Sequence, residues 1–172
     1  MAAPGTNKNG LDFRQPAGPR SVYVETSVWG MTLGNQPRAL REPTMRFFRQ
    51  CASGAFRPYI SDVVLDEIEA ASAPVAARMR REIDKLAPSV LILGPDGAAP
   101  AMAYLQAGII PAKKRADARH VAVATVAGLE LVVSWNNRHL ANERKRTLFN
   151  AVNRLAGYNR EVTILTPFEV MQ

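Results

Sequence analysis

A chain of 172 residues, 47% of them hydrophobic, is long and apolar enough to fold as one globular domain. Its formal net charge of +7 favours a polyanionic partner. The longest apolar stretch is too short to span a bilayer, and residues 1–20 hold no apolar segment of a signal peptide. We therefore expect a cytoplasmic protein that makes no use of a membrane. The single cysteine, Cys51, excludes an internal disulfide.

The first twenty residues are rich in Pro, Gly, Ala and Asn without periodicity, and they predict a flexible leader (1–20) before one folded domain (21–172). From there, runs of β-formers alternate with helical runs. Strands are predicted at 21–26, 58–61, 89–93, 129–134 and 161–165. Helices are predicted at 37–52, 62–72, 74–86, 99–107, 116–127 and 147–156. Because most strands are followed by a helix, we expect an α/β domain in which helices cover both faces of a parallel sheet of about five strands.

Common nucleotide and zinc motifs are missing from the sequence. There is no GxxxxGK[ST] loop, no GxGxxG, no HExxH and no CxxC. Two histidines in the whole chain also make a Ser-His-Asp hydrolase an unattractive interpretation. The chemistry has to come from other residues.

Three acidic residues and one asparagine stand where a strand ends or a helix begins. Glu25 closes the first strand in "SVYVETSV", where a carboxylate is unusual. Glu67 borders the apolar side of its helix, Asp117 lies in the first turn of a very apolar helix, and Asn136 follows a strongly apolar strand. The carboxyl ends of parallel strands meet at one edge of a sheet, so we expect these four side chains to lie together.

Each of these residues also has a simpler structural explanation. Glu67 could reach out to water from the rim of the helix, Asp117 could only cap its helix, and Asn136 could be an ordinary turn residue. Their combination favours a metal site. Carboxylates about 5 Å apart repel by roughly 3 kcal/mol at an effective dielectric near 20. Mg²⁺ or Mn²⁺ removes that conflict and prefers oxygen ligands.

These residues together resemble the pattern of the PIN-domain ribonucleases, the family that includes the toxins of VapBC-type toxin–antitoxin pairs. In that family a strand ends in an acidic residue followed by Thr-Ser, as in "YVETSV", and a Ser precedes a helix with a Glu six residues on, as Ser61 and Glu67 do. A third acidic residue opens a helix, as in "ADARHVAVA", and the next strand ends in Thr/Ser-x-Asp/Asn, as in "SWN". Glu25 and Asn136 stand where the family usually has Asp. The similarity covers about residues 21–170.

The resemblance implies a three-layer α/β/α fold and metal-dependent hydrolysis of RNA that leaves 5′-phosphate and 3′-hydroxyl ends. It implies that Glu25, Glu67 and Asp117 hold Mg²⁺ or Mn²⁺, that Asn136 completes the ligand shell directly or through water, and that Thr26 or Ser27 helps to orient it. A small antitoxin protein and a second copy of the chain are the implied protein partners.

Two other interpretations stay open from the sequence. One is a PIN-like fold kept as a non-catalytic RNA-binding or protein-interaction module, which the unusual Glu25 and Asn136 would permit. The other is a Rossmann-like nucleotide-binding domain, against which the missing Gly-rich loop speaks.

Basic residues concentrate in two stretches that follow the predicted site. The residues are Lys113, Lys114, Arg115 and Arg119 in the first stretch and Arg138, Arg144 and Arg146 in the second. We expect them to hold the RNA backbone through its phosphates, although a charged run is also typical of an ordinary solvated surface.

Four other side chains invite a functional interpretation, and each has a structural alternative. His120 could approach the metal site, but a histidine on an apolar helix is more often a hydrogen-bonded core residue. Trp29 and Trp135 could stack on a base, but tryptophan beside a strand end more often packs. Cys51 is expected to be a small core residue at a helix end.

Overall fold

The computed structural model describes residues 18–172, so most of the predicted leader lies outside the described residues. The folded chain contains five strands that all run parallel. They are β1 (Arg20–Val24), β2 (Phe56–Ser61), β3 (Ser89–Leu91), β4 (Leu131–Val133) and β5 (Thr163–Leu165). The prediction of an α/β domain with a parallel sheet of about five strands is confirmed.

The strand order β3-β2-β1-β4-β5 places the first strand at the centre of the sheet. The chain adds β2 and β3 on one side of β1 and then crosses to add β4 and β5 on the other. β1 and β4 are therefore neighbours whose following connections leave in opposite directions. This is a topological switch point, and ligand sites of open α/β sheets lie in the crevice outside the carboxyl ends of such strands.

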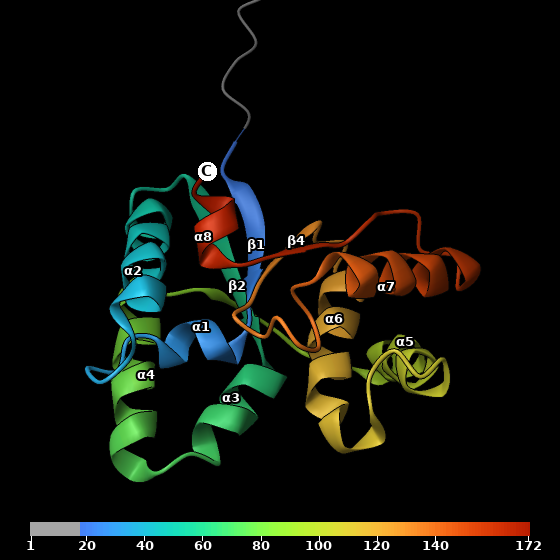
Figure 1. Cartoon of the computed structure of the whole chain (residues 1–172), viewed down its shortest axis with the longest axis horizontal. Coiled ribbons are helices and arrows are strands. Elements are labelled where there is room, and N and C mark those ends of the chain that lie inside the picture. Colours follow the sequence, from blue (N-terminus) through green and yellow to red (C-terminus); the bar gives the residue numbers. More distant parts are fainter. Residues whose placement is uncertain (1–17) are drawn as a thin grey trace, which may run out of the picture.

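Helices cover the sheet on both sides and complete a three-layer α/β/α arrangement (Figure 1). In Figure 1, α2, α4 and α8 lie on one side of the strands, and α5, α6 and α7 lie on the other. The helices of residues 18–172 are α1 (Thr26–Gly30), α2 (Arg38–Ala52), α3 (Asp62–Glu69), α4 (Ala73–Leu86), α5 (Pro95–Gln106), the 3₁₀ turn η1 (Ala112–Lys114), α6 (Arg115–Val126), α7 (Glu143–Leu155) and α8 (Pro167–Val170). None of these helices is long and apolar enough to cross a lipid bilayer.

Side-chain caps explain two short helices that the sequence did not predict, α1 and α8, and the early start of α7. The Glu25 side chain accepts a hydrogen bond from the Ser27 amide and so starts α1 directly after β1. Asn142 caps α7 by accepting from the Lys145 amide, so this helix starts four residues before its predicted start. A capping box of Thr166 and Glu169 starts the short α8.

The two tryptophans pack within the protein, as the alternative to base stacking predicted. Trp29 is fully buried and stacks on Phe48, with ring centroids 4.9 Å apart. The Trp135 indole donates a hydrogen bond to Thr44 Oγ1 at 2.8 Å and is half-buried. Trp29 of α1 and Trp135 after β4 therefore both pack against α2, beside the strand ends that carry the candidate site.

Cys51 is buried near the end of α2, and burial raises the pKa of its thiol to about 12. The thiolate is the reactive form, so we expect a disulfide reagent to label native Cys51 at least about 100-fold more slowly than a free cysteine at neutral pH. Labelling kinetics with and without urea measure this difference. Equally fast labelling of the native protein would show that the thiol is open to solvent.

Candidate metal centre at the carboxyl edge of the sheet

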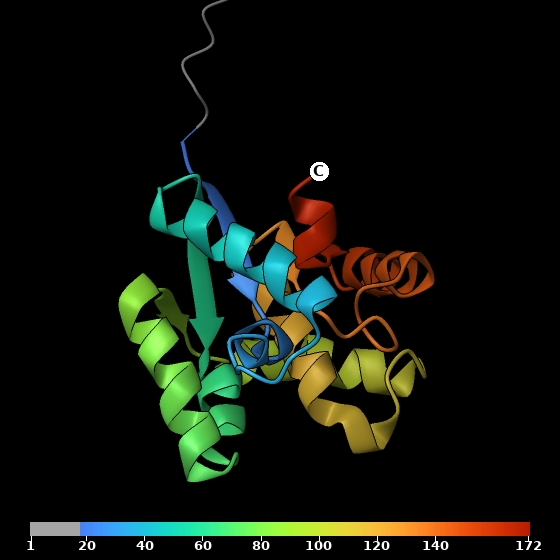
Figure 2. The ribbon, with the colours of Figure 1, turned by 60° about the vertical axis from the view of Figure 1, so that its left-hand side comes forward.

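Side chains from three connections meet beside the switch point between β1 and β4. Glu25 directly follows β1, Glu67 comes from α3 after β2, and His120 comes from the second turn of α6. Figure 2 shows α1, α3 and the first turns of α6 gathered below the ends of β1 and β2. Residues 25, 67 and 120 are thus brought together by the parallel sheet, although they lie far apart in the sequence.

The Glu25 carboxylate is buried and held by two serine hydroxyls. Its Oε2 accepts hydrogen bonds from the Ser27 hydroxyl and, at 2.8 Å, from the Ser134 hydroxyl. Each serine oxygen in turn accepts a backbone amide, Trp135 N at 2.9 Å on Ser27 and Asn136 N at 2.9 Å on Ser134. Because the amide is a donor and the Glu25 carboxylate is an acceptor, each serine donates its hydroxyl proton to Glu25. Within residues 18–172, its other oxygen, Oε1, accepts no hydrogen bond.

Glu67 turns towards the same point and is not a rim residue that reaches only water. Its Oε2 accepts hydrogen bonds from the Thr26 hydroxyl and, at 2.9 Å, from His120 Nε2. Although burial acts to raise the pKa of Glu67, these hydrogen bonds and the charge of His120 outweigh it and lower the pKa. Glu67 is therefore ionised at neutral pH, whereas Asp66 and Glu69 on the same helix are exposed.

His120 is fully buried, and both of its ring nitrogens have partners. Nδ1 lies 2.7 Å from the Tyr23 hydroxyl, which itself lies 2.7 Å from Ser61 Oγ. Nε2 lies 2.9 Å from Glu67 and 3.7 Å from Glu25 Oε1. Although burial disfavours the charged ring, the two carboxylates raise the pKa of His120. His120 is thus a hydrogen-bonded core residue, as expected, and also a direct neighbour of the site.

Glu25, Glu67 and His120 form a group that could hold a metal ion. One ligand atom from each residue lies within 4.8 Å of the others. Two carboxylates and one imidazole are groups that bind divalent metals in proteins. These three residues could therefore hold a metal ion at this edge, and His120 is among them although the sequence favoured Asn136 and Asp117 as the partners of the two glutamates.

Asp117 lies one turn before His120 on α6 and is outside this three-residue group. It is only 9% exposed, and its Oδ2 has no hydrogen-bond partner in the described part of the chain. Burial raises the pKa of the Asp117 carboxyl, while the Asn136 side chain and the charges of His139 and His120 act in the opposite direction. The N-cap position of α6 is Lys114, and Asp117 lies in the first turn, where its negative charge is favourable at the helix start.

Asn136 stabilises a turn and also lies close to Asp117. Its Oδ1 accepts a hydrogen bond from the His139 amide at 3.1 Å, which closes the loop after β4. The same side chain also lies near enough to Asp117 to favour the ionised form of that carboxyl. Asn136 therefore links the loop after β4 to α6 at the site.

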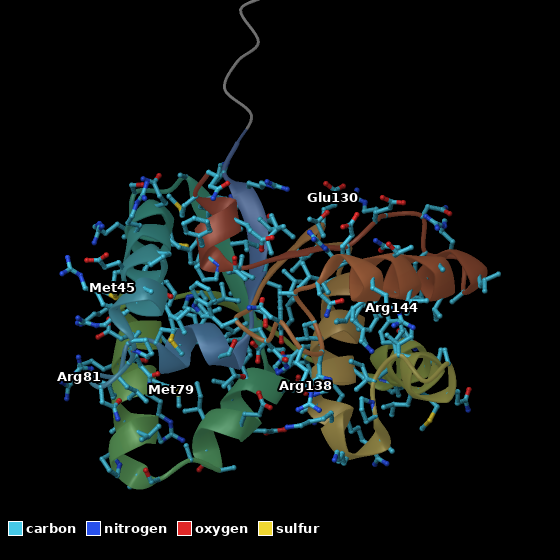
Figure 3. The ribbon with its side chains drawn as sticks, viewed as in Figure 1. Met45, Met79, Arg81, Glu130, Arg138 and Arg144 are labelled. Carbon is cyan, nitrogen blue, oxygen red and sulfur yellow. The ribbon has the colours of Figure 1, made fainter. Side chains whose placement is uncertain are left out.

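The predicted basic residues surround α6 and the loop after β4. Lys113, Lys114 and Arg115 are exposed in η1 and at the start of α6, and the Arg119 guanidinium lies 3.9 Å from Asp66. Figure 3 shows Arg138 near the ends of α3 and α6, and Arg144 on α7. Arg144 is exposed and Arg146 is half-buried.

Sequence reasoning missed Ser134 as a partner of Glu25, although the "SWN" triplet that contains it was part of the pattern. It also favoured a core role for His120 over an approach to the metal site, because a single histidine in an apolar helix carries no sign of which residues surround it. No protein-family model matches this chain, and no curated protein matches it either.

Proposed function

We propose that this protein is a metal-dependent endoribonuclease of the PIN-domain type. Glu25, Glu67 and Asp117 would hold Mg²⁺ or Mn²⁺, and Asn136 would complete the ligand shell. The observation that carries this proposal is the buried Asp117 oxygen that lacks a hydrogen-bond partner in the described chain, one turn of α6 before His120, which contacts the Glu67 carboxylate at 2.9 Å. A buried carboxylate oxygen without a donor is costly unless a cation satisfies it.

The donor set fits a hard divalent cation. Glu25 Oε1 receives no hydrogen bond within residues 18–172, and Asp117 Oδ2 has none either, so both oxygens are available to an ion. His120 is engaged by Tyr23 on one side and by Glu67 on the other. We therefore assign His120 to holding the Glu67 carboxylate in place and not to binding the ion.

Hydrolysis would need three contributions: oriented carboxylates, a bound ion and residues that hold the RNA. Ser27 and Ser134 orient Glu25, and Thr26 and His120 orient Glu67. The bound ion would supply an activated water and neutralise charge on the scissile phosphate. The basic residues of the two predicted stretches would hold the RNA backbone on either side of that phosphate. Addition of water across the P–O3′ bond leaves 5′-phosphate and 3′-hydroxyl ends.

The biological role that goes with this activity is the toxin of a toxin–antitoxin pair, acting as a homodimer that a small antitoxin protein restrains. A gene for a small antitoxin-like protein directly upstream would support that role.

The second candidate is a PIN-like module that binds RNA or protein without cleaving. The position of His120 favours it, because an imidazole between Glu25 and Glu67 supplies a positive partner where an ion would otherwise be needed. Metal affinity distinguishes the two candidates.

Metal binding should raise the thermal stability of protein stripped of metal with EDTA. At a Mn²⁺ concentration about 100-fold above Kd, we expect the melting temperature to rise by about 5–10 °C. The Glu67→Gln variant should show little of this rise, whereas Glu69→Gln, an exposed glutamate on the same helix, should keep it. An unchanged melting temperature of the wild-type protein in Mn²⁺ would contradict the metal site and favour the module.

A further inference from the structure

Two adjoining grooves run along α2 and α4, on the side of the sheet away from α6 and α7 (Figures 1 and 3). The first has a volume of about 650 Å³ and is lined by α2, and the second, of about 610 Å³, lies between α4 and the loop 33–36. Gln36 lines both grooves. We call this surface the arginine trough, after the six arginines that line it: Arg38, Arg41, Arg46, Arg49, Arg78 and Arg81.

The positive charge of the arginine trough is largely unneutralised. All six arginines are exposed, and Glu42 is the acidic residue in the two linings. Glu42 pairs with Arg38 at 2.6 Å, while the other five arginines make no ion pair within residues 18–172. By contrast, Arg80 on α4 lies outside the trough and pairs with Glu69 at 2.8 Å.

The spacing of the arginines suits a linear polyanion better than a small anion. Arg38, Arg41, Arg46 and Arg49 follow one another along α2 at steps of three, five and three residues, so they are about 4.5, 7.5 and 4.5 Å apart along the helix axis at about 1.5 Å per residue. The opposite side of α2 packs Phe47 and Phe48 into the core, which fixes the direction of the arginines. The planar guanidinium fork matches phosphate oxygens.

We propose that the arginine trough binds the phosphate backbone of single-stranded RNA, as a second RNA contact apart from the carboxylates. Neither lining in the described chain includes an aromatic residue, so the trough offers no platform for base stacking. Binding there is therefore independent of sequence. The choice of RNA rests on the proposed function, whereas the preference for a phosphate backbone rests on the trough itself.

The trough is connected to the candidate metal centre by α1. This helix starts at Glu25 and leads through residues 31–32 to the loop 33–36 that lines both grooves. In Figure 1, α1 lies between the end of β1 and the pair α2 and α4. An RNA held in the trough stays close to the carboxylates, which raises its effective concentration there.

The test is the affinity of metal-stripped protein for a long single-stranded RNA of mixed sequence, measured in EDTA by fluorescence anisotropy over a range of salt concentrations. We expect the double variant Arg46→Gln/Arg81→Gln to bind about tenfold more weakly. For this double variant, the slope of log affinity against log salt concentration should be shallower by about 1.4, because two phosphate contacts are lost. Both arginines are exposed, so circular dichroism should show an unchanged fold.

The matched control is Arg20→Gln/Arg57→Gln, which removes the same charge from exposed arginines that lie outside the trough and make no ion pair within residues 18–172. An equal effect of both double variants would overturn the proposal, because the trough would then contribute only net charge. Selective loss of binding to vesicles of anionic phospholipid, with RNA affinity unchanged, would also overturn it in favour of a membrane.

The trough and the proposed nuclease activity can fail separately. Wild-type protein that binds RNA through Arg46 and Arg81 but never cleaves it would contradict the nuclease and support the trough. If the Arg46→Gln/Arg81→Gln variant cleaves RNA with the KM and the RNA affinity of the wild type, the result would support the nuclease and contradict the trough.

Discussion

Replacing Asp117 with asparagine should lower metal-dependent RNA cleavage by at least about 100-fold, because even the outer partners of a metal site contribute 10- to 100-fold. The same variant should be as stable as wild type without metal, or more stable by about 1 kcal/mol at neutral pH. Burial raises the pKa of Asp117, so its ionised form weakens the folded state. The gain should vanish in acid, where Asp117 is protonated in the wild-type protein as well.

Cleavage of a labelled RNA with Mn²⁺ and urea unfolding in EDTA measure the two effects. Asp96→Asn is the matched control, since Asp96 lies in the first turn of α5 but is exposed. The Asp96→Asn variant measures the effect of losing an acidic residue at a helix start, which should lower the free energy of unfolding by only a few tenths of a kcal/mol. Unchanged cleavage by Asp117→Asn would contradict its role as a metal ligand, and a large loss of stability would show that its charge is satisfied in the fold.

The fold was predictable because the sheet leaves a strong pattern in the sequence. The buried helix α6 reads as a run of small and apolar residues, and each strand reads as a short run of β-formers. The strand order was not predictable, because it depends on which helices cross to which face. Only that order shows that Glu25 and Asn136 flank the switch point.

The site was predictable only in part, for a physical reason. Glu25 and Glu67 stand out because a carboxylate at a strand end or beside an apolar helix face conflicts with local preference. Ser134 and Tyr23 cause no such conflict, since serine and tyrosine are ordinary at or near strand ends. Their importance comes from long-range hydrogen bonds, from Ser134 to Glu25 and from Tyr23 to His120.

The hydrogen bond between His120 and Glu67 should make the stability of the metal-free protein depend on pH in a bell-shaped way. The pKa of Glu67 is lowered in the folded state, so its contribution is present above its unfolded pKa of about 4.3 and is lost as pH falls through the folded value. The pKa of His120 is raised, so its contribution is full below about 6.5 and is lost as pH rises through the folded value. The pair therefore stabilises the fold most between the two unfolded pKa values, at about pH 4.3 to 6.5.

Glu67→Gln should flatten this bell, because glutamine keeps the shape of the side chain but not its charge and leaves Glu25 as the carboxylate that raises the pKa of His120. We expect the free energy of unfolding in EDTA to fall by about 1–2 kcal/mol between pH values of about 5 and 6, less than for a fully buried pair because the Glu67 side chain is 34% exposed. Urea unfolding of wild type, Glu67→Gln and the exposed control Glu69→Gln across a pH series measures the difference. A difference between wild type and Glu67→Gln that stayed constant with pH would show that His120 and Glu67 do not form an ion pair, since a neutral hydrogen bond contributes equally on both sides of these pKa values.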